Sequence, residues 1–203
     1  MNSVSGAQNV NVKTVGIVGG GAMGVSLAAL FLFKGYNVVL STRRKEVLGE
    51  LGEKVNFYVN KMGTDSVGEL TVVSELAQLS TCQIIVEALE ENLEVKKHLL
   101  VEVEKICPTS FLYTNTSSLS ITDLASVLKN PSNFAGMHFF NPPHKMQLVE
   151  VVKTATTSQQ CVDTAVQVAT ALGKTAIVVN DSPGFVVNRL LMPFLLDAVK
   201  LRD

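Results

Sequence analysis

The stretch TVGIVGGGAMG, residues 14–24, decides the architecture expected for this chain. Its first five residues are typical of a short buried strand, and three glycines close that strand. A long apolar segment without helix breakers follows at 22–34, and residues 38–40 form a second run of the buried-strand type. This order of strand, glycine turn, helix and strand predicts one βαβ unit.

The glycine turn fits the pattern G-x-G-x-x-G, in which the glycines allow a tight turn, close approach of a pyrophosphate, and close helix–strand packing. The motif alone is a weak signal, and a glycine turn without a ligand is the alternative. The strand before it and the helix after it favour a ligand. We therefore predict that a dinucleotide binds at Gly19, Gly20, Gly21, Ala22, Met23 and Gly24.

The second strand does not end in the acidic residue that would hold the ribose 2′-hydroxyl of NAD. It continues as Ser41, Thr42, Arg43 and Arg44. Hydroxyls and guanidinium groups suit a 2′-phosphate, through charge-assisted hydrogen bonds. The alternative is that the two arginines are only the solvated start of a helix. Thr42 and Arg43 are therefore candidate cofactor residues, and NADP is an alternative to NAD.

Strands and helices are predicted to alternate along the rest of the chain. The strand-like runs are 70–73, 83–86, 110–113, 135–139, 148–152 and 175–179. Helical period marks 74–79, 93–107, 120–128 and 158–172, whereas 44–67 carries only weak helix signals. This alternation predicts a doubly wound α/β fold with a mostly parallel sheet.

The pattern breaks at residues 180–184, NDSPG, and a new apolar helix is expected at 185–200 with a kink at Pro193. We divide the chain into a disordered lead (1–13), a dinucleotide-binding domain (14–182) and the first helix of a further helical domain (183–203).

The composition excludes several classes of protein. Of the 203 residues, 47% are apolar, which is enough for a core, and the net charge of −1 argues against a nucleic-acid partner. No apolar run reaches the roughly 18–20 residues that a membrane helix needs. The lead lacks the regions of a secretory signal, so we expect a cytoplasmic protein. Cys82, Cys107 and Cys161 show no metal-ligand spacing, and no metal site is predicted.

The stretch GMHFFNPPHKMQLVEVV, residues 136–152, places His138 and Glu150 in an apolar segment. On pattern alone, a histidine in such a strand is more often a core residue than a catalytic one. An imidazole nevertheless suits a proton acceptor, because its ordinary pKa is roughly 6.5, and a carboxylate behind it fixes the tautomer.

Five segments together resemble the 3-hydroxyacyl-CoA dehydrogenase family, including its 3-hydroxybutyryl-CoA members. They are VGIVGGGAMG (15–24), VEALEENLEVK (86–96), NTSSLSIT (115–122), GMHFFNPPHKMQLVEVV (136–152) and DSPGFVVNRLL (181–191). The resemblance covers nearly the whole chain from Thr14. It implies a Rossmann-type domain that binds NAD, and an oxidoreductase of fatty acid metabolism that interconverts 3-hydroxyacyl-CoA and 3-oxoacyl-CoA.

The resemblance also implies roles for single residues. His138 would be the general base, Glu150 its partner, and Ser117 and Asn188 the residues that contact substrate oxygens. Further cofactor contacts are expected from Glu91, Lys96, Ser117 and Asn141.

The chain departs from the family's pattern at three places. Thr42 stands where the family usually has Asp, which puts the NAD preference in doubt. The stretch between Thr42 and residue 86 is shorter than usual. Lys45, Lys54 and Lys61 are basic candidates there for coenzyme A contact, but none belongs to a recognisable motif. Beyond its first helix, the family's C-terminal helical domain is missing.

The apolar side chains of 185–200 would therefore be exposed. They are Phe185, Val186, Leu190, Leu191, Phe194, Leu195 and Val199. We expect a homo-oligomer, or a separate helical partner, through this helix. Two alternatives to a complete acyl-CoA dehydrogenase stay open: a cofactor-binding domain that is inactive without a separate helical domain, and a dehydrogenase of free 3-hydroxy acids.

Overall fold

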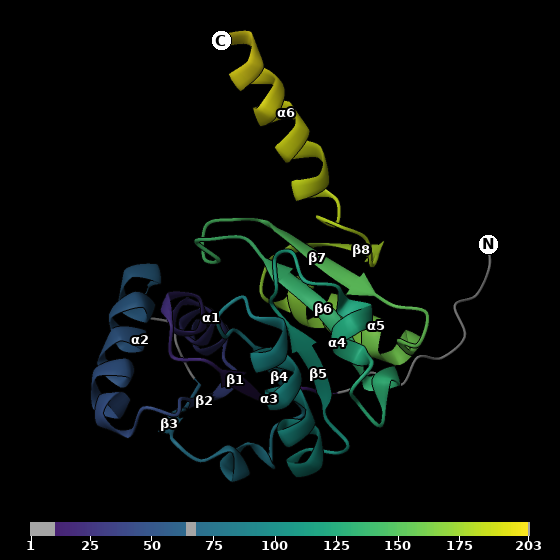
Figure 1. Cartoon of the computed structure of the whole chain (residues 1–203). Helices are drawn as coiled ribbons and strands as arrows, with labels where there is room; N and C mark the ends of the chain where they lie inside the picture. The colour runs from purple at the N-terminus through teal and green to yellow at the C-terminus, as the bar shows by residue number, and fades with distance from the viewer. Residues whose placement is uncertain (1–10, 64–67, 203) are drawn as a thin grey trace, which may run out of the picture.

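The computed structural model describes residues 11–63 and 68–202, so most of the predicted lead lies outside the described residues. Eight strands form one sheet in the order β3-β2-β1-β4-β5-β6-β7-β8 (Figure 1). All neighbouring strands are parallel except β6 and β7, which pair antiparallel. The strands are β1 (Thr14–Val18), β2 (Asn37–Ser41), β3 (Leu70–Val73), β4 (Ile84–Glu87), β5 (Phe111–Thr114), β6 (Phe134–Phe139), β7 (Leu148–Lys153) and β8 (Thr175–Asn180).

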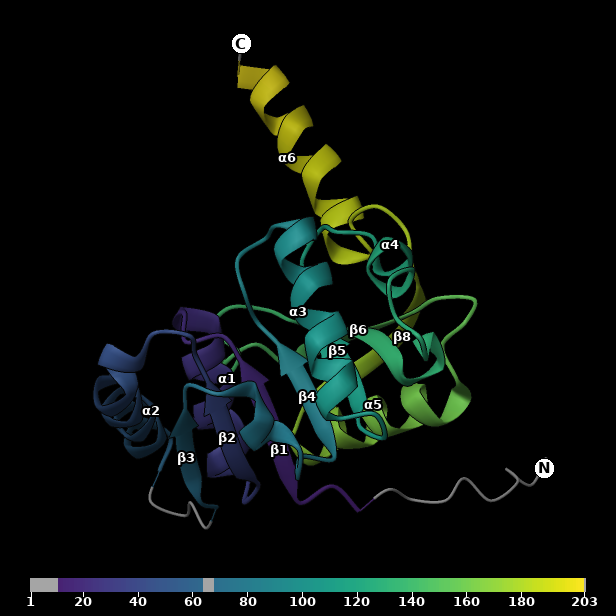
Figure 2. The same ribbon diagram turned by 60° about the horizontal axis from the view of Figure 1, so that its bottom comes forward.

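Helices cover both faces of the sheet (Figures 1 and 2). One hydrophobic core lies under α1, α2 and α5, and a second lies under α3 and α4. The helices are α1 (Ala22–Phe33), α2 (Leu48–Met62), α3 (Leu93–Ile106), α4 (Ile121–Ala125), α5 (Gln159–Ala171) and α6 (Val187–Arg202), with short 3₁₀ turns η1 (Lys45–Val47), η2 (Leu76–Leu79) and η3 (Pro131–Asn133).

The central strands are mostly apolar because both of their faces are buried. In β4, Ile84 and Val86 pack into the first core and Ile85 packs into the second. Such continuous apolar runs are typical of parallel strands covered on both faces. The predicted doubly wound, mostly parallel fold is confirmed, and the order β3-β2-β1-β4-β5-β6 is that of dinucleotide-binding sheets. The strand order reverses between β1 and β4, which is where such folds bind their ligands.

Several boundaries differ from the predictions. Residues 48–62 form a full helix despite their weak signals, because Leu51, Val55 and Val59 give α2 one buried face among polar residues. The helix predicted at 74–79 is only the 3₁₀ turn η2. Pro193 lies inside α6, and the helix continues through it to Arg202.

Helix α6 projects from the body of the molecule in both views (Figures 1 and 2). None of its residues is buried, and its exposed apolar side chains are Leu190, Leu191, Met192, Phe194, Leu195, Leu196, Val199 and Leu201. None of the helices in the described residues is long and apolar enough to cross a membrane.

Candidate active site

The glycine turn joins β1 to α1 at the point where the strand order reverses. Gly19 has φ +128°, and a Cβ there would lie 2.4 Å from the carbonyl oxygen of Ala88. A Cβ on Gly24 would lie 1.8 Å from the carbonyl oxygen of Gly19. Backbone packing therefore requires glycine at both positions, as predicted for the first and third glycines of the motif.

The middle glycine of the motif, Gly21, is explained by ligand binding and not by packing. A Cβ on Gly21 would meet no atom of the described residues within 4 Å, so packing does not demand a glycine there. Gly21 is also the N-cap of α1, and no side chain in the described part of the chain caps the helix at that point. The open approach and the uncapped N–H groups fit a pyrophosphate that lies against the backbone.

Two alanine substitutions separate these roles. We expect Gly24→Ala to lower the free energy of unfolding by about 3 kcal/mol, because its methyl group collides with rigid backbone. Gly21→Ala should change that free energy by less than about 1 kcal/mol, yet weaken cofactor binding at least about tenfold by occupying the ligand's space. Urea denaturation and cofactor titration measure the two effects. Equal loss of stability in both variants would contradict this division.

A pocket of about 440 Å³ opens beside the turn. The turn (Gly19–Gly21), the end of β2 (Ser41–Arg44) and the segment after β4 (Ala88–Glu90) line it together with α3. Leu76, Val95 and Leu99 give it an apolar wall. Of the predicted cofactor residues, Gly19, Gly20, Gly21, Thr42 and Arg43 line the pocket, whereas Ala22, Met23 and Gly24 form the first turn of α1. The apolar wall carries no motif, so sequence reasoning missed it.

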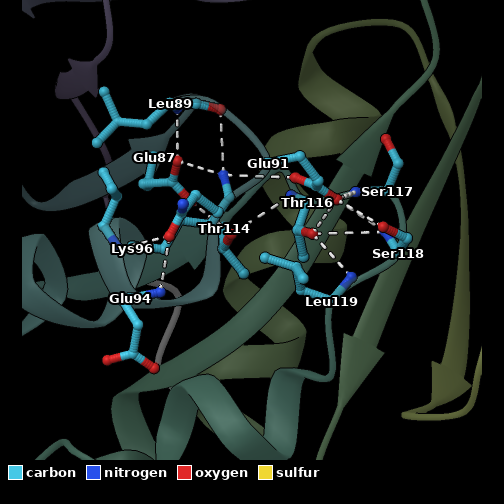
Figure 3. A network of polar contacts seen from close by, with 12 residues as sticks. Glu87, Leu89, Glu91, Glu94, Lys96, Thr114, Thr116, Ser117, Ser118 and Leu119 are labelled. Atoms are coloured by element: carbon cyan, nitrogen blue, oxygen red, sulfur yellow. Dashed lines mark hydrogen bonds and ion pairs between the residues drawn. The ribbon is translucent and has the colours of Figure 1, made fainter.

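A buried ion pair lies below the loop that follows β4 (Figure 3). Lys96, with only 1% of its side chain exposed, places Nζ 2.6 Å from Oε1 of Glu87 and 3.7 Å from Oε2 of Glu91. The ammonium group also donates to the carbonyl of Leu89. Oε2 of Glu87 accepts a hydrogen bond from the Thr114 hydroxyl at 2.6 Å. Glu87 was missed, because a single acid at the end of an apolar strand gives no sign of its partner.

Glu91 organises the turn that carries Ser117 (Figure 3). Its Oε1 accepts hydrogen bonds from the backbone N–H groups of Ser117 (2.8 Å) and Ser118 (3.0 Å) and from the hydroxyls of Thr116 and Ser118. Burial raises the pKa of this carboxyl, but the hydrogen bonds and nearby Lys96 outweigh that effect, so the pKa lies below its ordinary value. Glu91 therefore stays ionised at neutral pH and holds the Ser117 loop in place.

His138 and Glu150 face each other across the antiparallel pair of β6 and β7. Nδ1 of His138 lies 2.7 Å from Oε2 of Glu150, and both side chains are buried. A carboxylate at Nδ1 places the proton of a neutral imidazole there, which leaves Nε2 as the acceptor. The other oxygen of Glu150 accepts the backbone N–H groups of Val186 (3.0 Å) and Val187 (2.9 Å). Both carboxylate oxygens are thus fixed, and the pair is tied to the start of α6.

The expectation that Phe185 is exposed is wrong. Phe185 precedes α6, has φ +50°, and is only 2% exposed. Its ring centroid lies 5.7 Å from that of His138, and Phe140 lies 4.5 Å from the same imidazole on another side. In the turn before α6 the Phe185 N–H donates to the carbonyl of Ser182, and the aromatic side chain enters the second core instead of extending the exposed helix surface. It gives His138 an apolar surrounding.

The structure brings Ser117 and Asn188 together. Nδ2 of Asn188 donates to the carbonyl oxygen of Ser117 at 3.1 Å. Asn188 directly follows Val187, which binds Glu150, so all four predicted catalytic residues gather around the first turn of α6.

Asn141, a predicted cofactor residue, is exposed on the loop after β6. Another asparagine, Asn115, was missed, although its Oδ1 accepts the N–H of Phe139 at 2.8 Å and so links the ends of β5 and β6.

Asp181 fixes the segment between β8 and α6. Its Oδ2 accepts hydrogen bonds from the Thr122 N–H (2.8 Å), the Thr122 hydroxyl (2.7 Å) and the Ser120 hydroxyl (3.0 Å). Burial raises the pKa of this carboxyl, but these hydrogen bonds outweigh burial and leave the pKa below its ordinary value. The residue thus anchors the beginning of α6 to α4, close to the Ser117 loop.

Fold and pocket together define a dinucleotide-binding domain of the Rossmann type. The chain belongs to the 3-hydroxyacyl-CoA dehydrogenase family, because the model of the family described as "3-hydroxyacyl-CoA dehydrogenase, NAD binding domain" matches residues 14–182. The resemblance inferred from the five sequence segments is thereby confirmed.

Related proteins and a related crystal structure agree with this assignment. The mitochondrial hydroxyacyl-coenzyme A dehydrogenase of Sus scrofa is 36% identical, and the match covers 99% of this chain and 69% of the porcine protein. The 3-hydroxyadipyl-CoA dehydrogenase of Escherichia coli is 35% identical, over 93% of this chain and 42% of that protein. The crystal structure of (S)-3-hydroxybutyryl-CoA dehydrogenase from Ralstonia eutropha superposes with a TM-score of 0.86 at 32% identity, covering 93% of this chain and 70% of that one.

Proposed function

We propose that the protein interconverts 3-hydroxyacyl-CoA and 3-oxoacyl-CoA with a nicotinamide cofactor. The observation that carries the proposal is the buried His138–Glu150 pair, which lies near the carboxyl edge of the sheet in a chain of this family. Ser117 and Asn188, which contact each other beside that pair, complete the proposed catalytic set.

In the oxidative direction, Nε2 of His138 takes the proton of the C3 hydroxyl group. A bound nicotinamide cofactor would supply the acceptor for the hydride that leaves C3. Glu150 holds the imidazole in the required tautomer and stabilises the imidazolium ion that forms. Its second oxygen is held by the N–H groups of Val186 and Val187, so the carboxylate does not need to move during the reaction. In the reductive direction His138 returns the proton to the C3 oxygen.

Ser117 and Asn188 supply groups for the substrate's oxygens. Within the described residues the Ser117 hydroxyl makes no hydrogen bond, so it is available to a ligand. Asn188 donates one N–H to the Ser117 carbonyl, which leaves its second N–H for the C3 oxygen or the thioester carbonyl. Glu91 and Lys96 act as supports of this loop, and we keep their direct contact with the cofactor as a prediction.

The test compares acetoacetyl-CoA with acetoacetate as oxidants of the reduced cofactor, using the complete chain. Cofactor affinity is measured separately by fluorescence of the reduced nicotinamide. Turnover of the thioester alone supports the proposal. Equal turnover of both compounds would favour a free 3-hydroxy acid dehydrogenase. Cofactor binding without turnover of either would favour a cofactor domain that needs a separate helical domain.

The exposed apolar side chains of α6 predict association with another helical surface, most simply that of a second copy. We expect light scattering to show that the molar mass rises with concentration. The double variant Leu190→Glu and Phe194→Glu, which changes two of the most exposed positions, should remain monomeric. A wild-type protein that stays monomeric at high concentration, with α6 formed, would refute the association.

A further inference from the structure

The end of β2 carries hydroxyls and positive charges where NAD-binding domains of this fold carry an acid. Ser41, Thr42, Arg43 and Arg44 follow one another along the pocket wall. The first acidic residue after β2 is Glu46, and it does not line the pocket. In this fold a carboxylate at the end of β2 holds the ribose 2′-hydroxyl, whereas a nearby arginine accommodates a 2′-phosphate.

The Thr42 hydroxyl lies against the glycine turn. Thr42 is buried, its N–H donates to Val73, and its Oγ1 accepts the N–H of Arg44 at 3.3 Å. A Cβ built on Gly20 would lie 3.2 Å from the same Oγ1. Within the described residues this hydroxyl donates no hydrogen bond, so its proton is available for an anion. A neutral hydroxyl also lacks the repulsion that a carboxylate would exert on a phosphate.

The two guanidinium groups beside Thr42 are exposed at the pocket. Within the described residues Arg43 makes no side-chain hydrogen bond or ion pair. Arg44 lies near Glu50 but contributes the least to lowering the pKa of that carboxyl, whose ion-pair partner is Lys54 at 2.5 Å. Both arginines are therefore positioned to bind a ligand without breaking a strong contact of the protein.

The negative charges that line the pocket come from other elements than β2. Glu90 follows β4 and Glu102 belongs to α3. Glu102 has His98 as a neighbour, with Nε2 3.4 Å from its carboxylate. The positive wall, formed by Arg43 and Arg44, follows β2, whose end lies next to the ribose position of this fold.

We propose that Thr42, Arg43 and Arg44 form a binding site for the 2′-phosphate of NADP(H), and that this chain prefers NADP(H) to NAD(H). The inference rests on the proposed function only in taking the ligand to be a nicotinamide dinucleotide. It assigns the positive wall to a phosphate monoester. The diphosphate bridge, which would lie at the glycine turn, does not explain why positive charges follow β2.

The test is calorimetric titration of the complete chain with NADPH and NADH, and with the fragments 2′,5′-ADP and 5′-AMP, all without substrate. We expect NADPH and 2′,5′-ADP to bind at least about tenfold more tightly than NADH and 5′-AMP, respectively. The NADPH advantage should fall as ionic strength rises, because it depends on exposed charges.

Variants test whether Thr42, Arg43 and Arg44 cause the preference for NADPH. The double variant Arg43→Gln and Arg44→Gln should lose the NADPH advantage and keep its NADH affinity, and Thr42→Asp should reverse the preference. Lys105→Gln, which changes an exposed cation of α3 outside the pocket, is the control and should change neither. Equal binding of the two cofactors, tighter binding of NADH, or a Thr42→Asp variant with an unchanged ratio would overturn the proposal. Tight NADPH binding without turnover would contradict the proposed dehydrogenase activity but not the phosphate site. Turnover with NADH alone would contradict the phosphate site but not the dehydrogenase activity.

Discussion

His138→Gln is expected to lower turnover of acetoacetyl-CoA by roughly 10²–10⁴-fold, the usual contribution of a general acid–base group. Glutamine can still donate a hydrogen bond to Glu150, so the buried carboxylate keeps a partner and the fold is preserved. It cannot accept and release the proton of the C3 hydroxyl. Cofactor affinity should be unchanged, because His138 does not line the pocket beside the glycine turn.

Steady-state rates and cofactor titration of the same preparation check this expectation. His144→Gln is the matched control, since His144 lies on the loop after β6 and has no assigned role. It should retain the wild-type rate. A His138→Gln variant as active as the His144→Gln control would show that the His138–Glu150 pair is a structural feature of the core.

Lys96→Met is expected to lower the free energy of unfolding by about 3–5 kcal/mol. The substitution leaves the buried carboxylate of Glu87 without its cation. Among the described residues, the Thr114 hydroxyl and the Leu89 N–H would remain as its hydrogen-bond donors. The Ser117 loop should also loosen, because Lys96 lies near Glu91.

Urea denaturation followed by circular dichroism measures this loss. Lys97→Met, one position along α3, is the control, because its partner Glu94 is exposed and 4.0 Å away. It should cost less than about 1 kcal/mol. The double variant Glu87→Gln and Lys96→Met removes both charges and should recover much of the lost stability. If Lys96→Met costs no more than Lys97→Met, the buried pair does not hold this part of the fold.

The fold was predictable from sequence because its signals are local. Each buried strand is a short, mostly apolar run, and glycines or capping residues mark the ends of the helices. The side chains of Ser120 and Ser158, for example, cap α4 and α5. Helix α2 was underestimated because only three of its residues are buried, and its polar surface hides the helical period. The position of Phe185 in the core depends on a turn in which this residue has a positive φ. A phenylalanine in the sequence does not predict such a backbone conformation.

The candidate site was predictable in its residues but not in its connections. Family motifs named His138, Glu150, Ser117 and Asn188, and the structure brings all four to one place. The groups that hold them were missed for a physical reason. The second oxygen of Glu150 is bound by backbone N–H groups, and any residue type except proline supplies those. Glu87 and Asn115 likewise act on neighbours far along the chain, which only the strand order brings close.

Transfer of a labelled hydride tests the proposed chemistry most directly. The complete chain is incubated with acetoacetyl-CoA and reduced cofactor deuterated at the transferring position of the nicotinamide ring, and the product is examined by mass spectrometry and NMR. We expect 3-hydroxybutyryl-CoA with one deuterium at C3 from the wild type, and a large loss of this product from His138→Gln. Unlabelled product, or no product when both ligands are bound, would contradict the assignment of this site as a hydride-transferring 3-hydroxyacyl-CoA dehydrogenase.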